Sequence, residues 1–143
     1  MERSRVTVLG IDHVGIAVSG DDPASATAAQ TFSRLLGVPA TEPETLAAQG
    51  VQVCFIPLES PNLELLTPAD QSGAVARFLE RRGEGLHHVC FAVDDIALEL
   101  RRLEAAGFEL IDRSPRDGHG GLVAFVHPRS AHGVLIELLE RRR

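Results

Sequence analysis

The 143-residue chain contains no lysine, no tryptophan and no tyrosine. Without lysine, Schiff-base catalysis and a phosphate-binding P-loop are both excluded, because each needs that side chain. Without tyrosine no phenol can act as a proton donor, and any aromatic stacking depends on six phenylalanines. The two cysteines, Cys54 and Cys90, form neither a CxxC pair nor a disulfide framework, so we expect free thiols in the core in a reducing compartment.

The chain also lacks a long apolar run and an excess of positive charge. No window approaches the length of a membrane span or of a signal peptide, which predicts a cytoplasmic protein without a membrane partner. The net charge is −6 at pH 7 and the acidic residues are dispersed, which argues against a nucleic-acid partner. The length predicts one domain, or two small modules that share a core.

An internal repeat dominates what is present. The phrase GIDHVGIAV at 10–18 returns as GLHHVCFAV at 85–93, with Gly, His, Val, Ala and Val in register. Each phrase is typical of a strand and is followed by helix signals and then by extended segments. We therefore predict an α+β fold of two tandem β-α-β-β-β modules, 1–67 and 85–143, joined by a connecting helix within 68–84. Together the modules are expected to form one domain with a curved mixed sheet.

Helix boundaries are predicted from capping and stop residues. The first helix is expected to start at Asp22 with Pro23 and to stop at Gly37. The connecting helix is expected to start at Ser72 and to stop at Gly83. The last helix is expected to start at Asp94 or Asp95 and to stop at Gly107. In the last helix, Leu98, Leu103 and Ala106 are expected to form the buried stripe. The expected strands cover 51–56, 62–66, 122–126 and 134–139, with further strands near 39–44 and 108–113.

Alternation of side chains along a strand separates the two faces of each repeated phrase. One face carries the recurring histidine and small residues, namely His13 with Gly15 and Ala17, and His88 with Cys90 and Ala92. The small residues are expected to leave room beside the histidines. Because His88 alone matches His13 in the repeat, whereas His87 matches Asp12, we select His88 over its neighbour.

The last strand of each module carries a carboxylate inside an apolar run, Glu64 in NLELL and Glu137 in VLIELL. A buried charge needs a compensating partner, and no lysine or nearby cation supplies one. If the modules pair about a pseudo-twofold axis, two imidazoles and two carboxylates converge. This donor set of His13, Glu64, His88 and Glu137 suits a divalent metal ion, with positions left for water or substrate.

The repeated frame with these residues resembles the vicinal oxygen chelate superfamily, which includes glyoxalases, fosfomycin-resistance proteins and extradiol dioxygenases. Within it, IDHVGIAV, LELLTP, GEGLHHVCFAVDDI and VAFVHPRS with GVLIEL are similar to the methylmalonyl-CoA epimerase family, over about 8–139. The resemblance implies an enzyme that interconverts the (2R) and (2S) forms of methylmalonyl-CoA in propionate metabolism. It also implies a homodimer and a metal held by the four residues above, with Co²⁺ first and Mn²⁺, Ni²⁺ or Zn²⁺ as alternatives.

The implied reaction removes the proton at C2 of an acyl-CoA and returns it to the opposite face, which calls for a base on each side. Glu137 is the first candidate base, and Glu64 or a water is the second. Because CoA carries phosphates, loop arginines are expected to line the mouth of the site, namely Arg113, Arg116 and Arg129. His119, in the glycine-rich segment RDGHGG, is a further substrate-binding candidate, whereas His127 and His132 are expected in loops.

Two positions depart from the family pattern. Arg129 stands where lysine is common, which keeps the charge but changes its geometry. Val53, beside Gln52, stands where some members carry a glutamate proposed as the second base. The family resemblance therefore does not itself supply the second base at this position.

Three alternative functions share this frame. A glyoxalase-type isomerase or lyase, acting on a thiol adduct, uses the same four ligand types. An extradiol dioxygenase uses two histidines and one carboxylate, so Glu64 would occupy a position that oxygen or catechol needs. A metal-free drug-binding module tends to use aromatic walls, which this sequence has no tryptophan or tyrosine to build.

Overall fold

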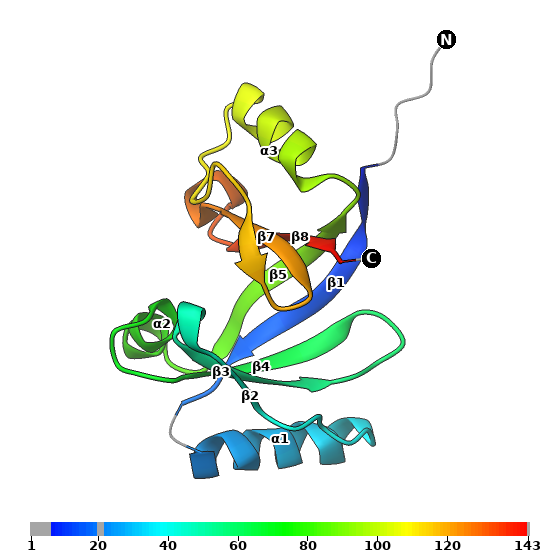
Figure 1. Cartoon of the computed structure of the whole chain (residues 1–143). Helices are drawn as coiled ribbons and strands as arrows, with labels where there is room; N and C mark the ends of the chain where they lie inside the picture. The colour runs from blue at the N-terminus through cyan, green and yellow to red at the C-terminus, as the bar shows by residue number, and fades with distance from the viewer. Residues whose placement is uncertain (1–6, 20–21, 143) are drawn as a thin grey trace. The chain divides into compact units, whose positions relative to one another are not determined.

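The computed structural model describes residues 7–19 and 22–142 (Figure 1). The strands are β1 Val8–Ala17, β2 Glu44–Leu46, β3 Val51–Ile56, β4 Asn62–Pro68, β5 Gly85–Val93, β6 Arg116–Gly118, β7 Gly121–Val126 and β8 Ile136–Arg141. The α-helices are α1 Asp22–Leu36, α2 Ala74–Arg82 and α3 Ile96–Ala105, with short 3-10 turns at Ala47–Gln49 and Pro128–Ala131. The order is β-α-β-β-β twice with α2 between, so the predicted α+β arrangement is confirmed. None of the described helices combines the length and the apolar character needed to span a membrane.

The chain divides into two compact units. His13–His87 form one, called here the central unit, and the described residues up to Asp12 together with those from His88 onward form the other, called the terminal unit. Strands β1 and β5 each pass from one unit to the other partway along their length.

The central unit is a mixed sheet covered by two helices. Strand β1 pairs in parallel with β4, and β4, β3 and β2 continue as antiparallel neighbours. Helix α1 packs on β3 and β4, and α2 also packs on β4 (Figure 1). The core joins the sheet to α2 through buried side chains, namely Ala17, Val51, Val53, Leu66 and Val75. Burial of these apolar groups is the main force that holds the unit together.

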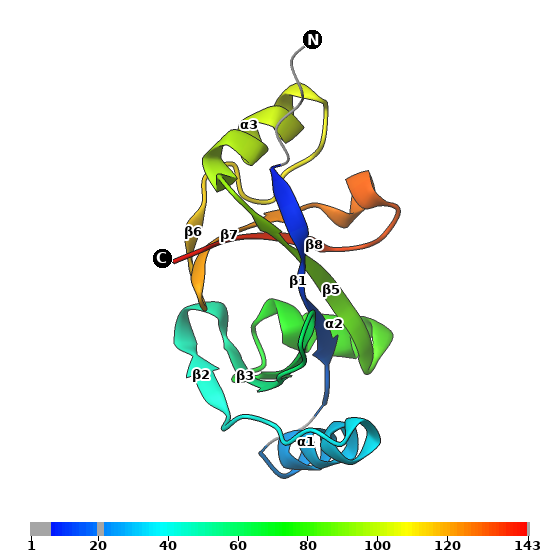
Figure 2. The same cartoon turned by 90° about the vertical axis from the view of Figure 1, so that its right-hand side faces the viewer.

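The terminal unit repeats that plan. Strand β5 pairs in parallel with β8, and β8, β7 and β6 continue as antiparallel neighbours. Helix α3 packs on β7 and β8, which Figure 2 shows together with β6. One core cluster of this unit consists of Val93, Ile96, Leu100, Ala124 and Leu138. In both units the first strand of the module therefore lies beside its last strand, where the histidine and the glutamate of the repeat are found.

Most predicted helix ends are confirmed. Helix α1 ends before Gly37, and α2 ends at Gly83, with positive φ angles of 71° and 76° that favour glycine. The Asp95 carboxylate accepts a hydrogen bond from the Leu98 N–H at 3.1 Å and caps α3. Gly107, with φ of 92°, follows the end of that helix. The predicted cap by Asp22 concerns a side chain outside the described residues.

The predicted cap of the connecting helix by Ser72 is wrong. The N-cap of α2 is Gly73, which has no side chain to accept a hydrogen bond. The Ser72 hydroxyl instead donates to the Asp70 carboxylate at 2.6 Å, in a turn that also uses the Ser72 N–H. These bonds lower the pKa of Asp70. A local side-chain bond has thus replaced the predicted cap.

Two predicted strands are displaced. The segment predicted near 39–44 forms a regular strand only from Glu44 onward, because Pro43 has no N–H to contribute to a ladder. The segment predicted near 108–113 forms no strand; Leu110 makes one isolated bridge with Val126. The corresponding strand is β6, which starts at Arg116 directly after Pro115.

The predicted buried stripe of α3 is confirmed only at Leu103, which is half-buried and packs against the core, whereas Ala106 is exposed. Leu98 is 40% exposed, whereas Ile96 and Leu100 are buried in the core. Glu99 is buried as well, at 1% exposure, because its carboxylate pairs with the Arg102 guanidinium at 2.9 Å. Glutamate is rarely fully buried in proteins unless it is paired, and the ion pair with Arg102 permits its burial here.

Candidate functional site

The central unit brings His13 and Glu64 together. In the parallel β1–β4 register Glu64 lies opposite Gly15, two residues after His13, so both side chains leave the same face of the sheet. His13 Nε2 lies 3.5 Å from Glu64 Oε1, and each residue is 6% exposed. Phe55 lies opposite Glu64 on β3 and meets the His13 ring edge-on, with centroids 6.3 Å apart at 84°. The imidazole is thus held between a carboxylate and an aromatic edge.

The terminal unit builds the same arrangement from the second copy. Glu137 lies opposite Cys90, two residues after His88, and Phe125 lies opposite Glu137 on β7. His88 Nε2 is 3.1 Å from Glu137 Oε1, with exposures of 5% and 9%. The His88 and Phe125 rings meet edge-on at 6.2 Å and 82°.

The two phenylalanines were missed by the sequence reasoning. Each belongs to the third strand of its module, in VQVCFI and GLVAFV, and recurs in the frame that relates the glutamates. An alignment of these two strands, in addition to that of the ELL triplets, would have predicted Phe55 and Phe125 as equivalent residues.

The neighbouring histidine has a different role. The His87 ring lies edge-on to Phe78 of α2, with centroids 4.9 Å apart at 79°. The Arg82 guanidinium carbon lies 5.8 Å from the Phe78 centroid. His88 faces Glu137 instead, so the two histidines separate as strand alternation predicts.

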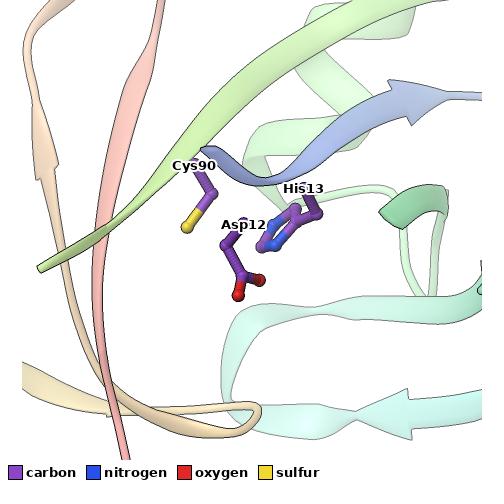
Figure 3. Close-up of side chains that lie close together, drawn as sticks. All are labelled: Asp12, His13 and Cys90. Carbon is purple, nitrogen blue, oxygen red and sulfur yellow. The ribbon is translucent and has the colours of Figure 1, made fainter. Parts of the chain in front are cut away.

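Asp12, the counterpart of His87 in the repeat, is already neutralised. Arg141 reaches Asp12 Oδ1 with Nη2 at 2.6 Å and with Nε at 2.9 Å. Figure 3 labels Asp12 and His13, which are consecutive on β1, and Cys90 on β5. Within the terminal unit, Cys90 is fully buried and packs with Val123 and Leu139. Because Asp12 has its own cation and Cys90 serves the core, the His–Glu pairs are the better donors for a metal.

Two of the small residues on the histidine faces, Ala17 and Cys90, do not leave the predicted room within their own units. Ala17 is 0% exposed and is enclosed by Val51, Val53 and Leu66. Cys90 is enclosed as described above. Small side chains here allow close packing of neighbouring strands, which the repeat pattern cannot distinguish from a ligand cavity.

The other thiol, that of Cys54, is poorly placed to act as a nucleophile or a metal ligand. Cys54 is buried and free, and burial raises the pKa of its thiol, with the negative charge of Glu64 raising it further. A raised pKa keeps the group protonated at neutral pH and disfavours both nucleophilic attack and metal ligation by sulfur. The prediction of free, buried cysteines is confirmed for Cys54 and Cys90.

The predicted substrate-binding residues lie at different depths. Arg116, on β6, is half-exposed and its guanidinium carbon lies 5.7 Å from the Phe125 centroid. Arg129 lies in the turn Pro128–Ala131, is 75% exposed and pairs with Glu109 at 3.4 Å. Arg113 is 84% exposed beside Glu104, and His119 is exposed between β6 and β7. Arg116 is connected to a His–Glu pair through Phe125, whose ring also contacts His88.

Each His–Glu pair fits a divalent metal ion chemically. Two donor atoms bound about 2.1 Å from one octahedral ion lie about 3 Å apart. The nitrogen–oxygen distances of 3.1 Å and 3.5 Å are close to that separation. Imidazole and carboxylate donors, buried and held by parallel strands, suit first-row divalent ions.

Comparisons with known proteins point to one family. Residues 12–125 match the model of the Glyoxalase/Bleomycin resistance protein/Dioxygenase superfamily. The chain is 37% identical over 131 residues to an ethylmalonyl-CoA/methylmalonyl-CoA epimerase of Cereibacter sphaeroides, covering 90% of this chain and 95% of that protein. A solved methylmalonyl-CoA epimerase from Mycobacterium tuberculosis superimposes with a TM-score of 0.88 at 32% identity, over 99% of this chain and 94% of that one. A methylmalonyl-CoA epimerase in complex with methylmalonyl-CoA and NH4+ gives a TM-score of 0.85 at 29% identity, over 94% and 96%.

Proposed function

This chain belongs to the Glyoxalase/Bleomycin resistance protein/Dioxygenase superfamily, and from that premise we propose that it is an epimerase acting on methylmalonyl-CoA. Relatives and structural neighbours that bear this name match it over at least nine-tenths of its length. The single observation in the structure that carries the proposal is the duplicated His–Glu pair, buried on parallel strands in each unit. We further propose that modules 1–67 and 85–143 build one functional domain through the connecting segment 68–84.

We propose that His13, Glu64, His88 and Glu137 together hold one divalent metal ion, with Co²⁺ as the first candidate and Mn²⁺, Ni²⁺ or Zn²⁺ as alternatives. The distances within each pair and the donor types support this set. Such an ion supplies Lewis-acid stabilisation of the negative charge that develops on the thioester and carboxylate oxygens.

The proton transfers are assigned to residues of the chain. The C2 proton passes to one carboxylate, and the electron pair of the C–H bond delocalises into the thioester carbonyl. A second base, protonated at the start, then delivers a proton to the opposite face of C2. Proton exchange with solvent returns both bases to their starting protonation states, so atoms and charge balance over the cycle. We assign Glu137 as the first base, and Glu64 or a water as the second, because Val53 lies where a further glutamate stands in some relatives.

Deuterium uptake tests this proposal directly. Methylmalonyl-CoA of one configuration is incubated in D₂O with purified protein, before and after chelation, and after addition of Co²⁺. We expect uptake at C2, measured by mass spectrometry, to be fast with loaded protein, slow after chelation and restored by the metal. A loaded protein that leaves the C2 proton in place would exclude the epimerase function, and a hemithioacetal substrate would be tested next.

We also propose that the protein acts as a cytoplasmic homodimer whose partner is an acyl-CoA. The complexes of related epimerases with methylmalonyl-CoA support the ligand class. The oligomeric state rests on the family resemblance, and light scattering after size-exclusion chromatography measures it. Cell fractionation with antibody detection tests the compartment.

A further inference from the structure

Arg116 shares a face of the terminal unit with the His88–Glu137 pair. It lies opposite Val123 in the β6–β7 register, and Val123 and Phe125 leave the same side of β7. Phe125 in turn lies opposite Glu137. The contacts agree with the register, because the Arg116 guanidinium lies over the Phe125 ring, whose edge meets His88. A cation thus stands one aromatic ring away from the proposed reaction site.

Asp112 holds this arrangement in place. Its Oδ2 accepts a hydrogen bond from the Phe125 N–H at 2.8 Å, and its Oδ1 lies 3.4 Å from Arg116 Nε. One carboxylate therefore fixes both the strand that carries Phe125 and the arginine above it. Within the described part of the chain, the ion pair of Arg116 uses Nε, which leaves the two terminal nitrogens to meet a ligand. The Arg116 side chain is 49% exposed, so those nitrogens are within reach of solvent.

The central unit shows that the fold does not require this cation. There Phe55 occupies the place of Phe125, and its N–H bonds to the Thr41 hydroxyl at 2.9 Å instead of to a carboxylate. In the β2–β3 register, Glu44 lies opposite Val53, at the position where the terminal unit has Arg116 opposite Val123. The same backbone frame thus tolerates a residue of opposite charge. The arginine and its aspartate are additions of the second copy, and packing alone does not account for them.

We propose that Arg116 binds the free carboxylate of the substrate's malonyl unit and that Asp112 is its positioning residue. This deepens the proposed function, on which it rests, by assigning the side chain that distinguishes thioesters with a second carboxylate from those without one. A guanidinium binds a carboxylate through two parallel charge-assisted hydrogen bonds. The phosphates of CoA are separated from the reacting carbon by the long pantetheine arm, so a cation beside the Phe125–His88 contact is placed for the acyl end of the ligand.

Equilibrium binding of two thioesters tests the assignment without relying on turnover. Malonyl-CoA carries the second carboxylate and propionyl-CoA lacks it, and isothermal titration calorimetry measures both affinities. We expect Arg116→Gln to weaken malonyl-CoA binding about 10-fold or more and to leave propionyl-CoA binding unchanged. Arg116→Lys keeps the charge but loses the paired donors of the guanidinium, so its affinity for malonyl-CoA is expected to lie between those of the wild type and Arg116→Gln. Arg101→Gln, which removes an exposed arginine from α3 in the same unit, is the matched control and should change neither affinity.

The positioning role of Asp112 has its own signature. Asp112→Asn should raise the KM for methylmalonyl-CoA more than it lowers kcat, and should add little to the effect of Arg116→Gln in the double variant. If Asp112→Asn changes KM and kcat equally in the wild type and in the Arg116→Gln variant, Asp112 acts only on the fold, and its proposed role in positioning Arg116 is overturned.

Failure of this inference is distinguishable from failure of the proposed function. If the wild type exchanges the C2 proton but Arg116→Gln keeps the wild-type preference for malonyl-CoA, the carboxylate assignment is overturned and the epimerase stands. If Arg116→Gln weakens the binding of both thioesters equally, Arg116 contacts the CoA part that they share, and the carboxylate assignment is again overturned. Loss of the malonyl-CoA preference in a folded variant supports the assignment, whether or not the wild type catalyses exchange.

Discussion

Replacement of Arg102 by methionine should expose the cost of a buried carboxylate. Glu99 is 1% exposed on α3, and its Oε2 accepts hydrogen bonds from Arg102 Nη2 at 2.9 Å and Nε at 3.2 Å. Its Oε1 is buried and has no hydrogen-bond partner among the residues that the structure describes. Arg102→Met keeps the aliphatic stem but removes the charge. The variant therefore leaves Glu99 with a buried charge and no guanidinium.

The size of the effect follows from burial on the two sides of the pair. Breaking a fully buried ion pair costs about 3–5 kcal/mol, whereas exposed pairs contribute about 0–1 kcal/mol. The Arg102 side chain is 55% exposed while that of Glu99 is 1% exposed, so we expect a loss of about 2 kcal/mol in the free energy of unfolding. For a chain of this length that loss lowers Tm by about 6 °C.

The pH dependence provides a second check. Burial alone would raise the pKa of Glu99, but hydrogen bonds from Arg102 and Thr7 and the charge of Arg102 outweigh it, and the pKa is lowered. A folded-state pKa below the unfolded value stabilises the protein above the unfolded pKa of about 4.3, and that stability is lost as pH falls through the folded pKa. The difference between wild type and Arg102→Met should therefore be largest near pH 7 and shrink towards pH 3.

Thermal and urea unfolding at pH 7 and pH 3, followed by circular dichroism, measure these differences. Arg101→Met is the matched control, because Arg101 is exposed on the same helix. A Tm of Arg102→Met equal to that of Arg101→Met at pH 7 would refute the reasoning, as would a difference that does not change with pH.

Three further outcomes are expected. His13→Ala should lower metal affinity about 100-fold or more, measured by inductively coupled plasma mass spectrometry after dialysis. Loss of a residue that only hydrogen-bonds to a metal ligand already costs about 10- to 100-fold, and loss of a ligand should cost at least as much. Glu137→Gln should slow C2 proton exchange about 100-fold or more, and near-normal exchange would contradict its role as base. Gly121→Ala should lower the free energy of unfolding by about 3 kcal/mol, measured by thermal unfolding, because an added Cβ would lie 2.1 Å from the Glu140 carbonyl oxygen. Gly73→Ala, with its nearest contact at 3.5 Å, should be tolerated.

The sequence by itself determined the repeated element order and the two His–Glu pairs. Strand alternation has a period of two, so a histidine that recurs in register must leave the same face in both copies. The parallel pairing of the first and last strands then places Glu64 beside Gly15 and Glu137 beside Cys90. Local signals also sufficed at several helix ends, where Asp95 and Gly83 act through their own backbone geometry.

Only the tertiary structure decided which side chains are buried and which meet across strands. Arg102 is local to Glu99, three residues away, but the burial of Glu99 also depends on the strands on which α3 packs, so no periodicity distinguishes it from a solvated glutamate. The contact of Arg116 with Phe125, and the place of Asp112 beneath both, depends on strand register set by Pro115 and the β6–β7 turn. Fixing such a pair of side chains costs conformational entropy, and contacts made throughout the fold must offset that cost. The local sequence therefore does not show whether the pair forms.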